Sequence, residues 1–166
     1  VKEQGTTFTV QLSFQEAAAE QAVEPPLVSV EDYGFLRGRK ILLCEDNEVN
    51  RQIACAILAR RGIEVDTAVN GRLGVDKFAA SMPGTYSVIL MDLRMPVLDG
   101  LAATRILRRL EHPEAKTIPI IAMTADVFPE TVQQCLEAGM NAHIGKPIDA
   151  QLLYRLLLQI LRPPQV

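Results

Sequence analysis

Tryptophan is absent from this chain of 166 residues, and aromatic residues make up only 5% of it. A hydrophobic core formed by this sequence must therefore be largely aliphatic. The chain also lacks an excess of charge of either sign, because 17 Lys and Arg residues stand against 20 Asp and Glu residues, giving a net charge of -3. A nucleic-acid-binding surface needs a basic face to neutralise phosphates. We therefore expect no nucleic-acid partner.

Long apolar runs are missing as well. No stretch of the sequence approaches the roughly 18 apolar residues that a membrane-spanning helix requires, and no signal-peptide pattern opens the chain. The three cysteines, Cys44, Cys55 and Cys135, do not have the spacing of metal ligands. They are best interpreted as reduced thiols, which are typical of cytosolic proteins. These features favour a cytoplasmic segment without direct membrane contact.

The first part of the chain differs from the rest. Residues 6–14 alternate apolar and polar side chains at the period of a half-buried strand. Residues 15–38 contain the pair Pro25-Pro26, which ends any helix, and their composition is that of a linker. We expect a terminal strand within residues 1–14, a linker over 15–38, a globular unit over 39–162 and a tail over 163–166.

Within the expected globular unit, short apolar runs alternate with segments of helical period. The runs predict strands at 41–44, 64–69, 88–91, 118–123 and 142–144, and the periodic segments predict helices at 49–58, 72–80, 101–111, 129–138 and 152–161. Runs that are apolar at every residue are typical of parallel strands covered on both faces. Five strands alternating with five helices predict a doubly wound α/β fold with helices on both faces of the sheet.

Two helical stripes are part of this prediction. In the first helix the apolar positions expected to face the sheet are Val49, Ile53, Ala54, Ile57 and Leu58. In the fourth helix the stripe is shorter and consists of Val132, Cys135 and Leu136. The shorter stripe predicts fewer buried contacts and an easier shift of the fourth helix.

Side chains capable of chemistry follow four of the expected strands. Glu45 and Asp46 follow the first strand, Asp92 follows the third, Thr124 ends the fourth and Lys146 follows the fifth. In an open parallel sheet, ligands bind beyond the carboxyl ends of the strands. Each residue alone has an ordinary explanation, since a strand-end Asp often forms a turn and a rim Lys is usually solvated. Their joint placement favours a functional site.

The residue types suit phosphoryl transfer. Crowded carboxylates repel one another unless a hard cation such as Mg²⁺ neutralises them. An ionised aspartate is a competent nucleophile toward phosphorus. A lysine supplies a compact positive charge for a phosphoryl oxygen, and a threonine hydroxyl can donate a hydrogen bond to another.

Four segments of the sequence resemble the signatures of response-regulator receiver domains, and the resemblance extends over residues 39–162. They are residues 41–47 (ILLCEDN), 91–100 (MDLRMPVLDG), 123–125 (MTA) and 145–148 (GKPI). The resemblance implies a flavodoxin-like sheet of order 2-1-3-4-5 and a cis peptide bond before Pro147. It further implies a phosphoacceptor at Asp92, phosphoryl binding by Thr124 and Lys146, and Mg²⁺ ligands from Glu45, Asp46, Asp92 and the backbone carbonyl of Arg94.

The sequence departs from the family at one position. Members usually carry Phe or Tyr three residues before the lysine, whereas this chain has His143. The resemblance makes Thr124 and His143 the switch residues. A packed strand histidine is the alternative, and a metal ligand is a weaker one because no second His or Cys lies nearby in the motif order.

The segment from Gly5 to Leu12 resembles the closing strand of a histidine-kinase ATP-binding domain. This second resemblance implies the C-terminal receiver of a hybrid sensor histidine kinase, anchored in the inner or plasma membrane, with its kinase domain in the same polypeptide. The chain itself lacks a complete kinase. The implied function is phosphorelay: the receiver takes a phosphoryl group from a kinase phosphohistidine, assists its own phosphorylation and dephosphorylation, and passes the group to a histidine phosphotransfer protein.

Two other hypotheses are open to test on the residues. A phosphatase or phosphomutase with an Asp nucleophile usually carries a second Asp two residues later, where this chain has Arg94. An interaction domain with a degenerate site would lack Asp92, Asp46 or Lys146, and all three are present. The sequence therefore favours the phosphorelay hypothesis.

Overall fold

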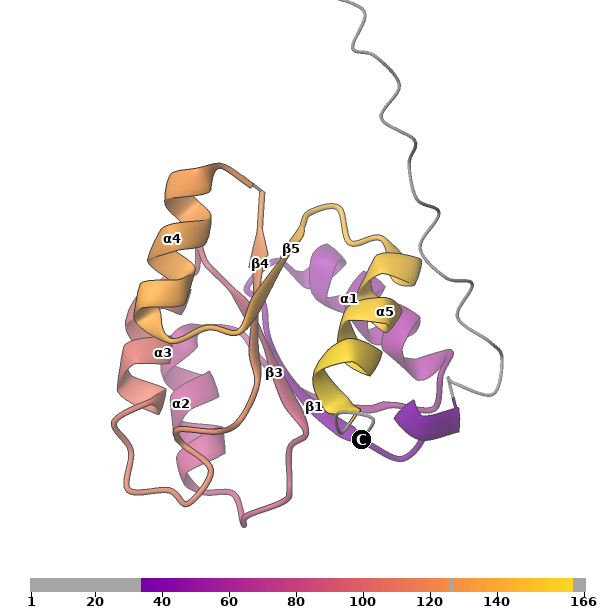
Figure 1. Ribbon diagram of the computed structural model, residues 1–166, viewed down its shortest axis with the longest axis horizontal. Helices are drawn as coiled ribbons and strands as arrows, with labels where there is room; N and C mark the ends of the chain where they lie inside the picture. Colours follow the sequence, from indigo (N-terminus) through magenta and orange to yellow (C-terminus); the bar gives the residue numbers. More distant parts are fainter. Residues whose placement is uncertain (1–33, 126, 163–166) are drawn as a thin grey trace, which may run out of the picture.

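The computed structural model describes residues 34–125 and 127–162. These residues form a five-stranded sheet of order β2-β1-β3-β4-β5 between two layers of helices (Figure 1). All four strand pairings are parallel. The strands are β1 (Lys40–Cys44), β2 (Glu64–Ala68), β3 (Val88–Asp92), β4 (Ile120–Thr124) and β5 (Ala142–Gly145). The doubly wound fold and the strand order 2-1-3-4-5 are confirmed.

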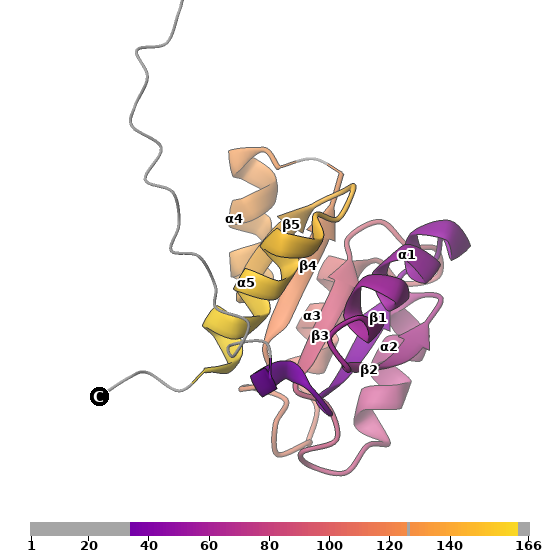
Figure 2. The same ribbon diagram turned by 90° about the vertical axis from the view of Figure 1, so that its right-hand side faces the viewer.

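The helices divide between the two faces of the sheet. The structure places α1 (Glu48–Ala59) and α5 (Ala150–Leu161) on one face, and α2 (Gly71–Ala79), α3 (Gly100–Leu107) and α4 (Pro129–Ala138) on the other (Figure 2). Alternate residues of β1 supply the two cores: Ile41 and Leu43 pack with α1 and α5, whereas Leu42 and Cys44 pack on the opposite side. This alternation explains why the strand is apolar at every residue.

Most helices begin immediately beyond the carboxyl end of a strand or its loop, with a side chain that caps the first turn. The capping oxygens belong to Asn47, Asn70, Asp99 and Asp149, and each accepts a hydrogen bond from a backbone N–H of the first turn. Helix α4 is different, because Phe128 provides no side-chain cap and Pro129 opens the helix. The start of α4 is therefore held by fewer local bonds than the starts of the other helices.

The predicted stripe of α1 is only partly correct. Ala54, Ile57 and Leu58 are buried, but the side chains of Val49 and Ile53 are 63% and 49% exposed. The first turns of α1 start at the rim, beyond the last residue of β1, where the sheet offers no apolar surface to cover. Leu136 of the predicted α4 stripe is exposed as well.

The third helix ends at Leu107 and not at residue 111 as predicted. Arg108 turns inward at this point and donates to the carbonyl oxygens of Ala115, Ile118 and Gly139 at 2.8 to 2.9 Å. It also donates to Asn141 Oδ1 at 3.0 Å. Arg108 therefore ties the end of α3 to the end of α4 and the start of β5.

The packed unit also begins earlier than residue 39. Leu36, which lies in the segment predicted to be a linker, has no exposed surface and lies in the core beneath α1 and α5. The guanidinium of Arg39 lies 4.1 Å from the centre of the Phe35 ring and donates to the Phe35 carbonyl. The predicted strand at 6–14, most of the linker and the tail at 163–166 lie outside the described residues.

Candidate functional site

The five side chains expected at the rim lie in one cleft. Glu45 and Asp46 reach it from the end of β1, Asp92 from β3, Thr124 from β4 and Lys146 from the segment after β5. The cleft has a volume of roughly 300 Å³ and is also lined by Asn47, Asn50, Leu93, Arg94 and Ala125. It opens at the carboxyl edge of the sheet, where a parallel α/β fold binds its ligands.

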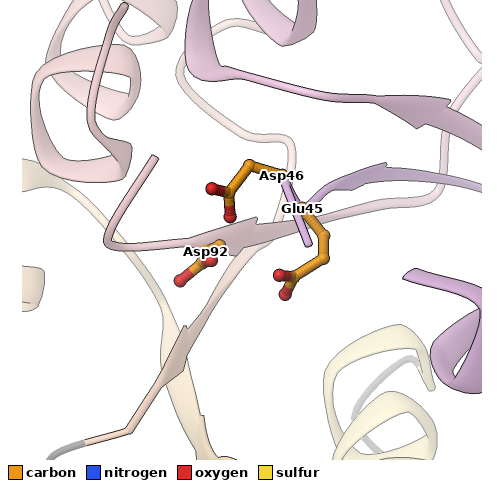
Figure 3. A group of neighbouring side chains, drawn as sticks. All are labelled: Glu45, Asp46 and Asp92. Carbon is orange, nitrogen blue, oxygen red and sulfur yellow. The ribbon is translucent and has the colours of Figure 1, made fainter. Parts of the chain in front are cut away.

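Three carboxylates form the acidic side of this cleft. Glu45, Asp46 and Asp92 each offer an oxygen, and these oxygens lie within 4.8 Å of one another (Figure 3). Glu45 and Asp92 are buried, whereas Asp46 is exposed. Hard oxygen ligands at this separation suit a divalent cation that keeps part of its water shell.

Lys146 lies between two of the three acids. Its Nζ atom is 2.6 Å from Glu45 Oε2 and 2.7 Å from Asp92 Oδ2. The three carboxylates outnumber the two cationic residues that line the cleft, Lys146 and Arg94, so the cleft has an excess of negative charge. The residues present therefore fit a divalent cation.

The local environment raises the pKa values of both Asp92 and Lys146. Burial raises the pKa of Asp92, and Glu45 adds to this, while the hydrogen bonds from Lys146 and from the Arg94 N–H oppose it. Burial alone would lower the pKa of Lys146, but its bonds to Asp92 and Glu45 prevail and raise it. Lys146 is thus held in its charged form beside the acids.

The loop after β3 folds back on Asp92. The Arg94 N–H donates to Asp92 Oδ1 at 3.1 Å, and a Cβ at position 100 would collide with the Asp92 carbonyl oxygen, so only glycine fits there. Between them, Leu98 N–H donates to the Pro96 carbonyl at 2.7 Å around Val97, which has a φ of 69°. This is the strained form of the γ-turn, and it is unusual for a β-branched residue.

Thr124 and Lys146 are joined through the backbone. Thr124 is buried at the end of β4, and its carbonyl accepts a hydrogen bond from the Lys146 N–H at 2.8 Å. The peptide bond between Lys146 and Pro147 is cis, as the sequence predicted. The hydroxyl and the ammonium therefore approach the cleft from neighbouring strands.

His143 lies outside the acidic cluster. It is half-buried and pairs in register with Ala122, two residues before Thr124, so the alternation of side chains puts it on the Thr124 side of the sheet. It lines an apolar groove with Val132, Leu136 and Leu156. This position fits a packed or switching histidine better than a metal ligand.

Two residues of the site were missed by the sequence reasoning. Asn50 Nδ2 lies 3.4 Å from Glu45 Oε1, which also accepts from the Asn47 N–H at 3.2 Å. Arg51 Nη1 donates to the backbone carbonyls of Glu45 and Asp46 at 3.0 and 3.1 Å. Their position in the first turn of α1, one turn beyond the acid pair, was the available signal.

No helix in the two described ranges is long and apolar enough to cross a membrane. The profile of the response regulator receiver domain matches residues 41–158. Among curated proteins, the hybrid signal transduction histidine kinase M of Dictyostelium discoideum is 40% identical over 121 residues, covering 72% of this chain and 5% of that protein. The probable histidine kinase 1 of Oryza sativa subsp. indica is 37% identical over 155 residues, covering 76% of this chain and 16% of that protein. The chain thus spans a small part of these relatives.

Solved structures give the same likeness. The receiver domain of a sensor histidine kinase from Pseudomonas aeruginosa, with a magnesium ion coordinated in its active site cleft, is 39% identical with a TM-score of 0.68, covering 75% of this chain and 98% of that one. In a co-crystal structure of the histidine phosphotransfer protein Ypd1 and the receiver domain of Ssk1 from Saccharomyces cerevisiae, the matching chain is 25% identical with a TM-score of 0.66. That match covers 76% of this chain and 90% of the other.

Proposed function

Because this chain belongs to the response regulator receiver domain family, we propose that its cleft transfers a phosphoryl group from a kinase phosphohistidine to Asp92. Asp92 then passes the group to a histidine of a separate phosphotransfer protein. The observation that carries this proposal is the position of Asp92, whose carboxylate shares the ammonium of Lys146 with the neighbouring acid Glu45. An ordinary structural ion pair would not need the further carboxylate of Asp46 in the same cluster.

A magnesium ion fits the donor set of this cleft. Glu45, Asp46 and Asp92 would hold it through carboxylate oxygens. The backbone carbonyl of Arg94, a residue that lines the same cleft, would be a further ligand. When bound, the ion offsets the negative charge of the phosphoryl oxygens. The proposal for this chain agrees with the magnesium ion in the Pseudomonas receiver domain.

The residues of the chain supply the remaining steps. A carboxylate oxygen of Asp92 attacks phosphorus, the P–N bond of the phosphohistidine breaks, and the imidazole nitrogen keeps the electron pair and gains a proton. The Lys146 ammonium, 2.7 Å from Asp92 Oδ2, is placed to bind a phosphoryl oxygen. The Thr124 hydroxyl lines the same cleft and would donate to another. The reverse reaction delivers the group to the next histidine.

We further assign Thr124 and His143 to the response that follows. Thr124, drawn toward the phosphoryl oxygen, would leave room that His143 enters from the neighbouring strand. The apolar groove around His143 is bounded by Val132 and Leu136 of α4. Movement of His143 would therefore change the packing of α4. The weakly capped start of α4 supports a shift of this helix.

The larger protein is proposed to be a hybrid sensor histidine kinase. Two relatives are named hybrid signal transduction histidine kinase M and probable histidine kinase 1, and this chain spans 5% and 16% of them. Residues 1–14 would contain the last strand of the kinase ATP-binding domain, and the residues from 15 to the start of the packed unit would be a linker. The receiver would lie on the cytoplasmic side of the membrane. The kinase domain of the same polypeptide would then be the phosphoryl donor.

An apolar rim next to the cleft supports a protein partner. Val49 and Ile53 are exposed on α1, and Ile53 borders a small recess with Asn50, Lys146, Pro147 and Ile148. A partner must bring its imidazole close to the buried Asp92, and apolar contacts beside the cleft can hold it there. The binding and the chemistry would thus share the first turns of α1.

The proposal is tested by comparing two phosphoryl donors. The wild-type chain is mixed either with a ³²P-labelled histidine phosphotransfer protein or with phosphoramidate, a small donor with the same P–N bond. Ile53→Glu should slow transfer from the protein donor and leave transfer from phosphoramidate unchanged. Met82→Glu is the matched control, since Met82 is exposed on the loop that precedes β3 and lies away from the cleft. Failure of the wild-type chain to accept a phosphoryl group from either donor would contradict the proposal.

A further inference from the structure

Arg51 makes contacts that neither the metal site nor the phosphoryl chemistry requires directly. Its Nη1 atom donates to two backbone carbonyls, those of Glu45 and Asp46, while its own backbone N–H donates to the Asn47 carbonyl at 2.9 Å. The side chain thus reaches back from α1 across the N-cap to the segment that carries two of the three acids. No described contact joins its guanidinium to a carboxylate of the cluster.

This arrangement fixes the direction of the acidic side chains. The Glu45 N–H donates to the Ala68 carbonyl of β2 at 3.0 Å, so β2 holds one side of this segment and Arg51 holds the other. Holding both carbonyls restrains the backbone torsions of Glu45 and Asp46, and those torsions set where the two carboxylates point. This restraint matters most for Asp46, because its side chain is exposed and few packing contacts orient its carboxylate.

We propose that Arg51 is a positioning residue for the cation site, acting through the backbone of Glu45 and Asp46 without touching the cation. The proposal rests on the magnesium site proposed above. Partners of this kind typically change metal affinity by about 10-fold or more when they are removed.

Two effects of Arg51 have opposite signs, which makes the proposal testable. As a positive charge near the cleft, Arg51 repels a cation, so its removal would tighten Mg²⁺ binding. By positioning Glu45 and Asp46, Arg51 favours Mg²⁺ binding, so removal of Arg51 would weaken Mg²⁺ binding. The sign of the change therefore separates positioning from simple electrostatics.

The experiment is a Mg²⁺ titration of the full chain, followed by the amide chemical shifts in nuclear magnetic resonance spectra. We expect Arg51→Met to raise the Kd for Mg²⁺ by about 10-fold. Arg51→Lys keeps the charge but loses the guanidinium fork, so it should also bind more weakly than the wild type. Arg60→Met is the control, because it removes an exposed arginine at the far end of α1 and should leave the Kd unchanged.

A second readout separates positioning from catalysis. With phosphoramidate as donor, Arg51→Met should need more Mg²⁺ for half-maximal rate but reach the wild-type rate at saturation. Equal or tighter Mg²⁺ binding by Arg51→Met, with normal binding by the wild type, would overturn this inference alone. Absence of Mg²⁺ binding by the wild type would overturn the proposed metal site and this inference with it.

Discussion

Replacing Lys146 by methionine removes the one ammonium of the acidic cleft while keeping an unbranched side chain of similar reach. In the wild type this ammonium is 2.6 Å from Glu45 and 2.7 Å from Asp92, and those side chains are only 1% and 6% exposed. The variant leaves two buried negative charges next to each other without the ammonium that pairs with both. We expect a loss of stability in metal-free solution.

The size of the loss follows from the burial of the pair. Removing one partner of a buried ion pair costs about 3–5 kcal/mol. The Lys146 side chain is 18% exposed and the cleft is open to water, so the lower end of that range applies, about 3 kcal/mol. For a domain of this size that loss lowers the melting temperature by roughly 10 °C.

Magnesium should restore much of this loss. A ligand present at about 100 times its Kd stabilises the folded state by about 2.7 kcal/mol. In the wild type the ammonium competes with the cation for the same oxygens, so Lys146→Met should bind Mg²⁺ more tightly. The rise in melting temperature on adding Mg²⁺ should therefore be larger for the variant than for the wild type.

Thermal unfolding followed by far-ultraviolet circular dichroism, with EDTA and with Mg²⁺, measures both effects. Lys77→Met is the control, since Lys77 pairs with Asp66 at side-chain exposures of 41% and 28%, and ion pairs open to solvent to this extent are worth about 1 kcal/mol or less. A Lys146→Met chain as stable as the wild type in EDTA would refute the reasoning. So would an equal response of the two chains to Mg²⁺.

Three further changes test other parts of the account. Leu36→Ala should lower the free energy of unfolding, measured in urea, by about 2–5 kcal/mol, because Leu36 is fully buried. A loss below about 1 kcal/mol would show that Leu36 does not belong to the core. Arg108→Ala should speed amide hydrogen exchange at Gly139, whose carbonyl Arg108 binds. In the wild type, a beryllofluoride phosphate mimic should alter exchange at the start of α4 and leave Gly139 unchanged. The reverse pattern would exclude Arg108 as the contact that holds the end of α4. The raised pKa of Asp92 means that ionising this carboxyl costs free energy in the folded state. The stability of the wild type relative to Asp92→Asn should therefore fall as pH rises from 3.8 through the raised pKa and then level off. A rise in relative stability over the same window, measured by thermal melting at each pH, would contradict this prediction.

The fold was predictable because β1, β3 and β4 are apolar on both faces and the helices are periodic. The site was predictable because parallel strands bring their carboxyl ends to one edge, so Glu45, Asp92 and Lys146 could be placed together from their order in the chain alone. Those inferences needed only the local sequence and the topology.

The errors arose where tertiary contacts determine which residues are buried and where a helix ends. Val49 and Ile53 fit a helical stripe, but whether the sheet reaches far enough to cover them depends on where α1 starts relative to the rim. Arg108 continues a helical pattern in sequence and nevertheless ends the helix, because the carbonyls it binds come from distant segments. Arg51 donates to the backbone of the acid pair, and its position one turn beyond that pair was the available signal in the sequence, without a side-chain pattern to single it out.

The central claim is that Asp92 accepts a phosphoryl group in a reaction that depends on the acidic cleft. Intact mass spectrometry after incubation with phosphoramidate tests it most directly. We predict one added phosphoryl group on the wild-type chain with Mg²⁺, none when EDTA replaces Mg²⁺, and none on Asp92→Asn under either condition. A phosphoryl group on Asp92→Asn, or on the wild type in EDTA at the same rate as with Mg²⁺, would contradict the account.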